Sequence, residues 1–579
     1  MKRLVESKQL NRSLFILSFI AIALLIIENG VTLPDWAEIV ILIVYSILLS
    51  GGISMTILRL MYKKTSNIRL IVFDVISVSF ILFCIFKQIT LQHSYHIITD
   101  WIRIAVIVKW VREMITRRLY YKRSLINPAQ LFIISFLVMI LCGTFLLMLP
   151  ESTYHGISFI DAFFMSTSSV CVTGLGVVDV STYFTHFGQT VIMLLIQAGG
   201  LGILTFASYF AYFFKGGATY ENQLALSDIS SSGKIGEVFT TLRRILIITF
   251  LIEFIGACFI YINLDKSFIP GFGDRIYFAV FHAISSFCNA GFSTMPKGMM
   301  EHELIFNYPL QLTMVLIFVF GGLGFPIMIN ILRYIKYFIK RYVLWFVSGE
   351  NNYRAWVMTL SSKINLITTL VLIVVGTAAF FIMEYSNSLA AHNGSGKIIT
   401  ALFSATTPRS AGLNTIDFSS LHISTIILII LLMWIGASPA STGGGIKTST
   451  FAIATLNFIS LAKGKSKIEL FRREVADISV RRAFATMTLS FVAIGTGICF
   501  LAHFEKDASL LEIAFECVSA YCTVGLTLGI TPELSDPGKI VLIALMFTGR
   551  VTMLSILIAF FKKVRPMSYQ YPTDEIMIN

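Results

Sequence analysis

Apolar stretches of membrane-spanning length recur along the whole chain, separated by short polar segments. Clear examples are residues 15–27, 37–50, 131–149 and 423–436. An α-helix needs about 20 residues to cross the hydrocarbon core, and several of these runs reach that length together with their flanks. The first run follows a basic start but precedes no small-residue cleavage site, so we expect an uncleaved span. The pattern predicts a multi-pass bundle of membrane helices.

Beyond residue 124 one motif occurs four times, each time between two apolar runs. The copies read MSTSSVCVTGLGVVD, HAISSFCNAGFSTMP, FSATTPRSAGLNTID and CVSAYCTVGLTLGIT, and they align without gaps on one glycine. These glycines are Gly174, Gly291, Gly412 and Gly525. A hydroxyl residue stands six positions before each of them, namely Ser168, Ser285, Thr406 and Ser519. Such a shared pattern indicates a fourfold internal repeat.

Each motif is too short to span a membrane and is less apolar than its flanks. We therefore expect a helix, a re-entrant pore helix with an extended turn, and a second helix in every repeat, because non-helical backbone at membrane depth must be buried or line a cavity. Four turns around one axis would form a ring of carbonyls that can replace the hydration shell of a small cation. Glycine suits such a turn, since it accepts positive φ and brings no side chain. Glycines that merely relieve helix packing would need no shared hydroxyl.

The predicted fold is an all-α integral membrane protein with four such repeats in pseudo-fourfold arrangement, preceded by about four transmembrane helices. Its parts are an N-terminal four-helix domain (1–123), pore repeats at 124–236, 237–355 and 356–478, and a fourth repeat with the C-terminal tail (479–579). Lys and Arg gather before the first span and in alternate later connections, whereas residues 29–38 and 88–99 contain none. By the positive-inside rule the N-terminus is cytoplasmic.

Composition supports the membrane class. Hydrophobic residues make up 56% of the chain and charged residues 13%, with a mean hydropathy of +0.79, which leaves too little charge to cover a soluble protein. The net charge of +13 lies in short blocks between spans, so we expect contact with the lipid bilayer and no nucleic acid. The eight cysteines show no CxxC spacing and indicate buried thiols rather than disulfides or a zinc site.

The segments VCVTGLGVVD, SFCNAGFST, TPRSAGLNTID and SAYCTVGLTLGIT resemble the four pore segments of the Trk/Ktr/HKT superfamily of potassium transporters. The likeness covers about residues 124–565 and is greatest to the bacterial membrane subunits TrkH and KtrB. It implies a multi-pass protein of the cell (inner) membrane that forms a homodimer. It also implies a cytosolic nucleotide-binding regulatory ring of the TrkA/KtrA type, with nucleotide on that partner only and no covalent cofactor here.

The resemblance implies that K⁺ or Rb⁺ binds in a selectivity filter and that this is the only metal site. The filter residues are Cys171, Val172, Thr173 and Gly174; Cys288, Asn289, Ala290 and Gly291; Arg409, Ser410, Ala411 and Gly412; and Cys522, Thr523, Val524 and Gly525. Glycine in all four turns goes with potassium in this family, whereas serine at the first marks a sodium-selective branch. A sodium or poorly selective monovalent pathway of the same fold is the alternative.

One departure from the family concerns side chains rather than carbonyls. Cys171, Cys288 and Cys522 replace the hydroxyl or small residues that the family usually has. Because carbonyls coordinate the ion, we expect little loss of selectivity, although three thiols offer a second possibility, a site for soft metals. Arg409 is the family's usual basic residue, and we expect its side chain to brace the filter from behind.

Each repeat carries glycines downstream of its turn, at 199–202, 321–326, 443–447 and 549–551. The third copy, SPASTGGGIKTST at 438–450, is too rich in Gly and Pro to remain helical. It is no phosphate loop, because it lacks the GxxxxGK order and follows no strand. The resemblance instead implies an intramembrane gate of Ser438, Ser441, Thr442, Gly443, Gly444, Gly445 and Lys447, contacted by Arg550. A snorkelling role for Arg550 is the alternative.

The last apolar segment before residue 124 carries basic residues on a three-residue grid, with Asp74 in the preceding span. The grid consists of Arg103, Lys109, Arg112 and Arg118. This resembles a voltage-sensor domain, in which spaced cations move in the membrane field. A basic amphipathic helix at the cytoplasmic interface is the other interpretation.

A membrane enzyme is a further class of function to weigh. It would need His, Asp or Cys side chains that converge at one depth. Instead His93, His96, His155 and His186 fall in expected outer loops, and no metal or nucleophile spacing occurs. We therefore predict that the chain is not an enzyme.

Overall fold

The computed structural model describes most of the chain, which is predominantly α-helical. The described residues are 8–30, 34–62, 78–83, 101–110, 128–215, 238–265, 268–348, 358–465, 467–551 and 556–557. Within these ranges the only paired strands are β1 (Glu469–Leu470) and β2 (Arg473–Glu474), which form a small antiparallel hairpin. The all-α prediction therefore needs this one small addition.

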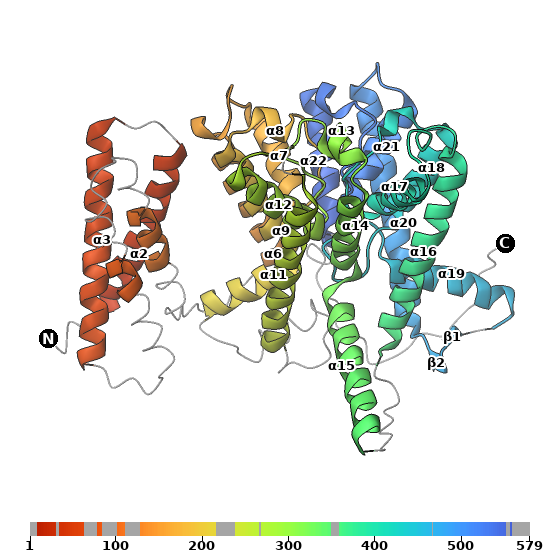
Figure 1. The fold of residues 1–579 in the computed structure, drawn as a ribbon, viewed down its shortest axis with the longest axis horizontal. Helices are drawn as coiled ribbons and strands as arrows, with labels where there is room; N and C mark the ends of the chain where they lie inside the picture. Colours follow the sequence, from red (N-terminus) through yellow and green to blue (C-terminus); the bar gives the residue numbers. More distant parts are fainter. Residues whose placement is uncertain are drawn as a thin grey trace, which may run out of the picture.

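The N-terminal helices form a small bundle at one end of the molecule (Figure 1). It contains α2 (Lys8–Gly30), α3 (Asp35–Tyr62) and the helical residues 78–83 and 101–110. Ala21, Leu48 and Val106 lie in its core, whereas many isoleucines and phenylalanines of the same helices are exposed on the outside. An apolar exterior of this kind suits a lipid environment rather than water.

The remaining helices repeat one pattern four times: a long helix, a short buried helix that ends at the glycine turn, and a second long helix. In chain order they are α6 (Pro128–Leu147), α7 (Phe159–Val170) and α9 (His186–Lys215); α11 (Val238–Asn263), α12 (Phe272–Cys288) and α14 (Tyr308–Leu323); α16 (Leu360–Glu384), α17 (Ser395–Thr406) and α18 (Ile423–Trp434); and α20 (Asp477–Phe504), α21 (Leu510–Tyr521) and α22 (Asp536–Val551). We call α7, α12, α17 and α21 the pore helices and the third helix of each set the inner helix.

Shorter elements join or extend these sets. They are α8 (Val180–Tyr183), α13 (His302–Ile305), α15 (Phe325–Ser348), which continues α14, and α19 (Thr448–Ala462), which follows α18 after a non-helical segment; single 3₁₀ turns lie at Pro150–Ser152, Gly298–Met300, Thr407–Arg409, Phe418–Ser420 and Thr531–Glu533. In Figure 1, α15 extends well beyond the rest of the helices.

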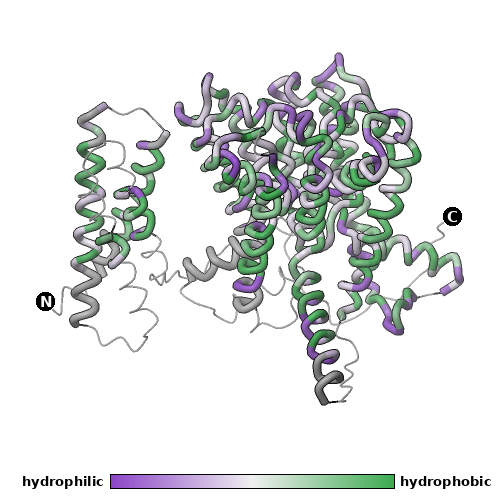
Figure 2. The backbone as a smooth tube through the Cα atoms, viewed as in Figure 1, coloured by the Kyte–Doolittle hydropathy of each residue, from purple (hydrophilic) through white to green (hydrophobic). Residues whose placement is uncertain are grey.

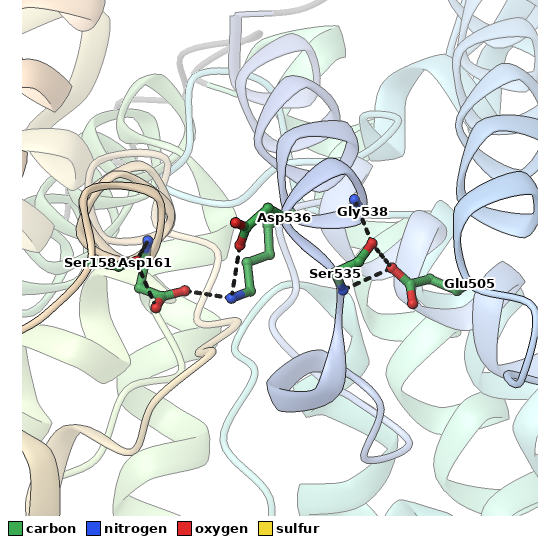
Figure 3. A network of polar contacts seen from close by, with 7 residues as sticks. Ser158, Asp161, Glu505, Ser535, Asp536 and Gly538 are labelled. Carbon is green, nitrogen blue, oxygen red and sulfur yellow. Dashed lines mark hydrogen bonds and ion pairs between the residues drawn. The ribbon is translucent and has the colours of Figure 1, made fainter.

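Packing between sets follows the chain order and then returns to the start. The inner helices α9, α14 and α18 each pack against the pore helix of the next set, and α22 packs against α7. An ion pair adds to this last contact, because Lys539 Nζ of α22 lies 2.6 Å from Asp161 Oδ1 of α7. Figure 3 shows this polar network, in which Ser158 caps the start of α7 and Ser535 and Glu505 hold the start of α22. The fourth set thereby lies beside the first.

Several helices have the length and apolar character of membrane spans. Among the described residues, Arg243–Asn263 of α11, Leu360–Glu384 and Asp477–Phe504 meet both criteria. The helices α14 and α15 meet them together, with a bend of 104° between them. Hydropathy along the backbone agrees, since the helices of the repeats are largely hydrophobic (Figure 2).

Candidate ion-binding turns and the loop beside them

The four glycine turns lie next to one another in a closed order. A Cβ added to Gly174 would collide with the carbonyl oxygen of Ala290 in the second turn. The same construction brings Gly291 against Gly412, Gly412 against the Val524 carbonyl, and Gly525 against the Thr173 carbonyl. Because every one of these neighbours is backbone, no side chain larger than hydrogen fits between the turns.

The turns also share an uncommon backbone conformation. Positive φ occurs at each glycine and again two residues earlier, at Val172, Asn289, Ser410 and Thr523. Non-glycine residues rarely adopt this conformation, and these four are among only seven that do so in the described chain. Successive carbonyls of extended backbone point to opposite sides, and left-handed residues at every second position let them turn to one side instead. The four turns thus share one backbone conformation, which allows their carbonyl groups to turn to the same side.

Hydroxyl groups of the pore helices hold the turns in place. Ser168 Oγ accepts from Gly174 N at 3.1 Å, and Ser519 Oγ accepts from Gly525 N at 3.1 Å. Ser285 Oγ instead donates to the carbonyl of Phe292, at 2.7 Å. The shared hydroxyl column therefore stabilises the backbone on either side of the glycine.

The third turn departs from this pattern. Thr406 donates to the Leu402 carbonyl of its own helix, and the neighbouring Thr407 bonds the Leu413 carbonyl beyond the glycine. In this repeat the hydroxyl that bonds the backbone beyond the glycine therefore lies one residue after the aligned column. Pro408 follows directly and cannot donate an N–H, and a 3₁₀ turn over Thr407–Arg409 shifts the contact by one residue.

Two ionisable side chains lie behind the turns at one equivalent position, nine residues before the glycine. His282 Nε2 lies 2.9 Å from Ser293 Oγ, while its Nδ1 lies 2.9 Å from the Phe278 carbonyl. That carbonyl can only accept, so Nδ1 carries the proton and Nε2 accepts from the serine.

The fourth repeat has the corresponding contact through a carboxylate. Glu516 accepts from Thr527 Oγ1 and, at 3.0 Å, from Thr531 Oγ1. The first repeat has an apolar pair in the same place, Met165 against Gly176. The second and fourth turns are therefore tied to their pore helices by polar side chains on the segment that leaves the glycine.

The predicted side chains that stand three residues before the glycine point away from the ring or are enclosed. Arg409 donates to the carbonyls of Thr369 on α16 and of Gly436, at 3.3 and 3.4 Å, so its guanidinium lies against its own repeat. Cys171, Cys288 and Cys522 are buried free thiols. In the described part of the chain no group of three or more His, Cys, Asp or Glu residues is arranged to hold a metal.

The inner helices pass their own pore helices at a glycine. A Cβ on Gly199, Gly321 or Gly549 would collide with the carbonyl of Val170, Phe287 or Tyr521, each the fourth residue before a turn glycine. Beyond this point α9 has a non-helical residue at Gly202, and α14 ends at Gly324, where φ is +83°. By contrast, α22 is helical through Val551, where its description stops. The glycines thus permit close passage, and the breaks come slightly later.

In the third repeat the inner helix α18 ends at Trp434, and a non-helical loop separates it from α19, which begins at Thr448. Ser438 N donates to the Gly322 carbonyl at 2.9 Å, and Phe325 N donates to the Ala440 carbonyl at 3.2 Å, which ties the loop to the break in the second repeat. Thr442 Oγ1 donates to the Phe287 carbonyl at 3.0 Å, and Gly444 N donates to Ser410 Oγ at 3.1 Å. The loop therefore contacts residues of two turns and one broken inner helix at once.

Arg550 of the fourth repeat reaches this loop. Its guanidinium donates to the Thr442 carbonyl through Nη1 and to the Gly199 carbonyl through Nη2, the latter at 2.8 Å. Arg550 is 7% exposed, so it is enclosed rather than snorkelling. Lys447 Nζ donates back to the Gly443 carbonyl at 2.7 Å. The predicted gate residues Ser438, Ser441, Thr442, Gly443, Gly444, Gly445, Lys447 and Arg550 thus lie together.

Known proteins resemble this chain in sequence and in fold. The family described as "TrkH: Cation transport protein" matches residues 93–571. The chain belongs to this TrkH family. The Ktr system potassium uptake protein B of Bacillus subtilis is 35% identical over 472 residues, which are 81% of this chain and 98% of that protein. The potassium/sodium uptake protein NtpJ of Enterococcus hirae is 34% identical over 468 residues, 79% and 98% of the two chains.

A solved structure gives the same fold for the TrkH family. The crystal structure of the potassium transporter TrkH from Vibrio parahaemolyticus matches with a TM-score of 0.59 and 16% identity, covering 84% of this chain and 97% of that one. The resemblance inferred from the four motifs is confirmed at the level of family and membrane protein class. The family match begins at residue 93, earlier than residue 124, so it includes part of the predicted fourth N-terminal helix.

The N-terminal charges of this TrkH-family chain are described only in part. Arg103 pairs with Glu28 of α2 at 3.0 Å, and Lys109 is 1% exposed. Asp74, Arg112 and Arg118 lie outside the described residues.

Sequence reasoning missed several buried polar residues of the repeats. Besides His282 and Glu516 they include Asn365, whose side-chain oxygen accepts from Thr448 Oγ1 at 2.6 Å beside the loop, and Glu253, which accepts from Gln197 at 3.1 Å. A signal existed for the first two. Both are ionisable residues inside short, buried, largely apolar helices, in the same column of the repeat alignment.

Proposed function

We propose that this chain carries potassium ions across the cell membrane, with rubidium as a close substitute, through a pseudo-fourfold pore at the centre of the four turns. The closed order of the glycine turns, each with positive φ at two positions, carries the proposal. A ring of carbonyls directed one way can replace the hydration shell of a monovalent cation. Relatives named as potassium uptake proteins support the choice of ion.

In this proposal residues 438–446 and Arg550 form the gate beside the filter. The contacts of the loop with two turns, with the second inner helix and with Arg550 support that role. A cytosolic nucleotide-binding ring of the TrkA/KtrA type would open the gate of a homodimer whose N-terminus is cytoplasmic. Deletion of residues 438–446 should then give potassium flux that no longer needs the ring. Flux that stays fully dependent on the ring would contradict the gate.

Ion uptake tests the main proposal. We expect the chain, with a candidate regulatory subunit, to restore potassium-limited growth of a cell that lacks potassium uptake. In proteoliposomes, unlabelled K⁺ and Rb⁺ should compete with ⁸⁶Rb⁺ at similar concentrations, whereas Na⁺ should need at least about tenfold more, a difference of about 1.4 kcal/mol.

A sodium-conducting pathway is the second candidate, favoured by the potassium/sodium name of the Enterococcus relative. The same competition experiment separates the two, because equal potency of Na⁺ and K⁺ would assign the chain to the less selective class. The family resemblance argues for potassium, because glycine in the first turn, here Gly174, goes with potassium there and serine with sodium.

A further inference from the structure

Two cations of the N-terminal bundle, Arg103 and Lys109, lie against its other helices. On the helical residues 101–110, Arg103 and Lys109 stand six positions apart, with Val106 between them. Val106 and Lys109 are buried, whereas Ile104 and Ile107 on the other side are exposed at 40% and 42%. A basic amphipathic helix at a membrane surface would have the opposite arrangement, with its cations outward and its isoleucines covered. Within residues 101–110 this arrangement favours the sensor-like interpretation over the amphipathic one.

The two cations occupy separate layers of the bundle. In one layer Glu28 of α2 pairs with Arg103 at 3.0 Å and accepts from Tyr45 Oη of α3 at 2.9 Å. In the other, the side chain of Lys109 runs over Gly52 of α3, where a Cβ would collide with it. Six helical residues correspond to about 9 Å along the axis. Residues 101–110 thus place one cation in each of two successive layers of the bundle.

Apolar side chains separate the two layers. Leu48, Val106 and Ala21 are fully buried between them and come from three different helices. A thin layer of low dielectric concentrates an applied field, because charges and water lie on either side of it. A cation that crosses such a layer crosses a large part of the membrane potential, even if it moves by only one or two helical turns.

We propose that this bundle is a voltage-responsive domain, in which residues 101–110 carry Arg103 and Lys109 through the apolar layer when the membrane potential changes. The Arg103–Glu28 pair stabilises one end of the movement. Gly52 leaves space along α3 for a long cationic side chain. Helices α2 and α3 lie outside the family match, whereas residues 101–110 with both cations lie inside it.

Transient charge movement tests the proposal without relying on conduction. The full chain is reconstituted in a voltage-clamped bilayer with impermeant ions only, and the charge displaced by voltage steps is integrated. We expect a saturating charge–voltage curve for the wild type. Arg103→Gln and Lys109→Gln should each reduce the total charge or the slope, whereas Arg103→Lys should keep both. Glu28→Gln should shift the midpoint, because it removes the partner of Arg103 at one end.

A matched control neutralises a cation outside the bundle. Lys465→Gln changes an exposed lysine and should leave the curve unchanged. Steady conductance in symmetrical K⁺ gives a second readout: one charge that crosses the whole field changes the open-to-closed ratio by roughly 50-fold per 100 mV. Absence of any saturating charge, or unchanged curves in both Gln variants, would overturn the proposal. Loss of K⁺ conductance with the charge movement intact would count against the cation pathway alone.

Discussion

The third repeat differs from the other three in how the chain passes the end of its own pore helix. In the first, second and fourth repeats a glycine lets the inner helix pass the end of its own pore helix, with no space for even a methyl group. In the third, the chain leaves the helix at Trp434 and resumes it only at Thr448. Its turn is also displaced, since Thr407 rather than Thr406 bonds the backbone after the glycine.

The difference shows which parts of the repeat are structural and which are free to specialise. All four turns keep positive φ at the same two positions, so this backbone conformation is common to every repeat. The helix after the turn, in contrast, can be interrupted in one repeat, provided that other hydrogen bonds replace those that it loses. Here the replacements come from Gly321 and Gly322 of the second repeat and from Arg550 of the fourth.

The largest effect is expected where the helical passage is tightest. Gly321→Ala places a methyl group against the Phe287 carbonyl, and neither backbone can move away. We expect loss of more than about 2 kcal/mol of stability and at least a tenfold fall in ⁸⁶Rb⁺ uptake per cell. The adjacent Gly322→Ala is the matched control, because its Cβ would meet only ordinary contacts at 3.8 Å. Similar behaviour of the two variants would show that the passage is not limiting.

A smaller effect is expected from the bond that joins the loop to the fourth repeat. Arg550→Gln removes the charged donor from the Thr442 and Gly199 carbonyls, and each such bond contributes about 1.5–3 kcal/mol. We expect resting flux without the regulatory ring to rise about tenfold, measured as ⁸⁶Rb⁺ leak from proteoliposomes. Arg550→Lys should lie between, and Arg481→Gln, at an exposed position, should match the wild type. A leak no higher in Arg550→Gln than in Arg481→Gln would contradict the role of this bond.

A pair of nearly isosteric changes tests the displaced hydroxyl. Thr407→Val removes the bond to the Leu413 carbonyl directly after the third turn glycine, whereas Thr406→Val removes only a bond within α17. We expect Thr407→Val to raise the relative uptake of Na⁺ several-fold, because one corner of the carbonyl ring loses its support. Thr406→Val should keep the wild-type selectivity. The reverse result would restore the hydroxyl that the sequence alignment favoured.

The smallest expected effect is the pH dependence of stability that arises from the loop between α16 and α17. His392 is buried beside Tyr308, at 3.2 Å from its hydroxyl, and burial together with Lys397 holds the pKa of His392 below its usual range. Protonation therefore costs the folded state more than the unfolded chain, so stability is complete above a pH of about 6.5 and declines as the pH falls below it.

Thermal unfolding measures this contribution. Between pH 7.5 and 5 the wild type should lose roughly 1–3 °C of Tm more than His392→Gln. The control is His155→Gln, which changes an exposed histidine in the corresponding loop of the first repeat and should leave the pH dependence of the wild type unchanged.

Local sequence predicted the elements that depend on local geometry. The glycine columns identified all four turns, because positive φ and the absence of a side chain are requirements of a single position. The Gly-rich stretch at 443–445 likewise identified the non-helical loop. The displaced hydroxyl was missed, since it depends on how Pro408 and the 3₁₀ turn shift the backbone by one residue.

Contacts between distant segments could not be deduced in the same way. Glu516 contacts Thr527 only because the chain turns back after Gly525. Asn365 contacts Thr448, which lies 83 positions later in the chain. The inward direction of Arg103 and Lys109 required the positions of α2 and α3. Periodicity places residues on one face of a helix, but the surrounding helices decide whether that face meets lipid or protein.

The ion pair between Lys539 and Asp161 joins the last repeat to the first, so four quarters of one polypeptide complete a circle. In a ring of four identical chains, every mutation would be present in all four subunits. Here a change in one quarter leaves the other three untouched, and a single non-helical loop can arise without three further copies that crowd the same space. Covalent linkage thereby gave evolution access to an asymmetry that a symmetric tetramer cannot reach by point mutation.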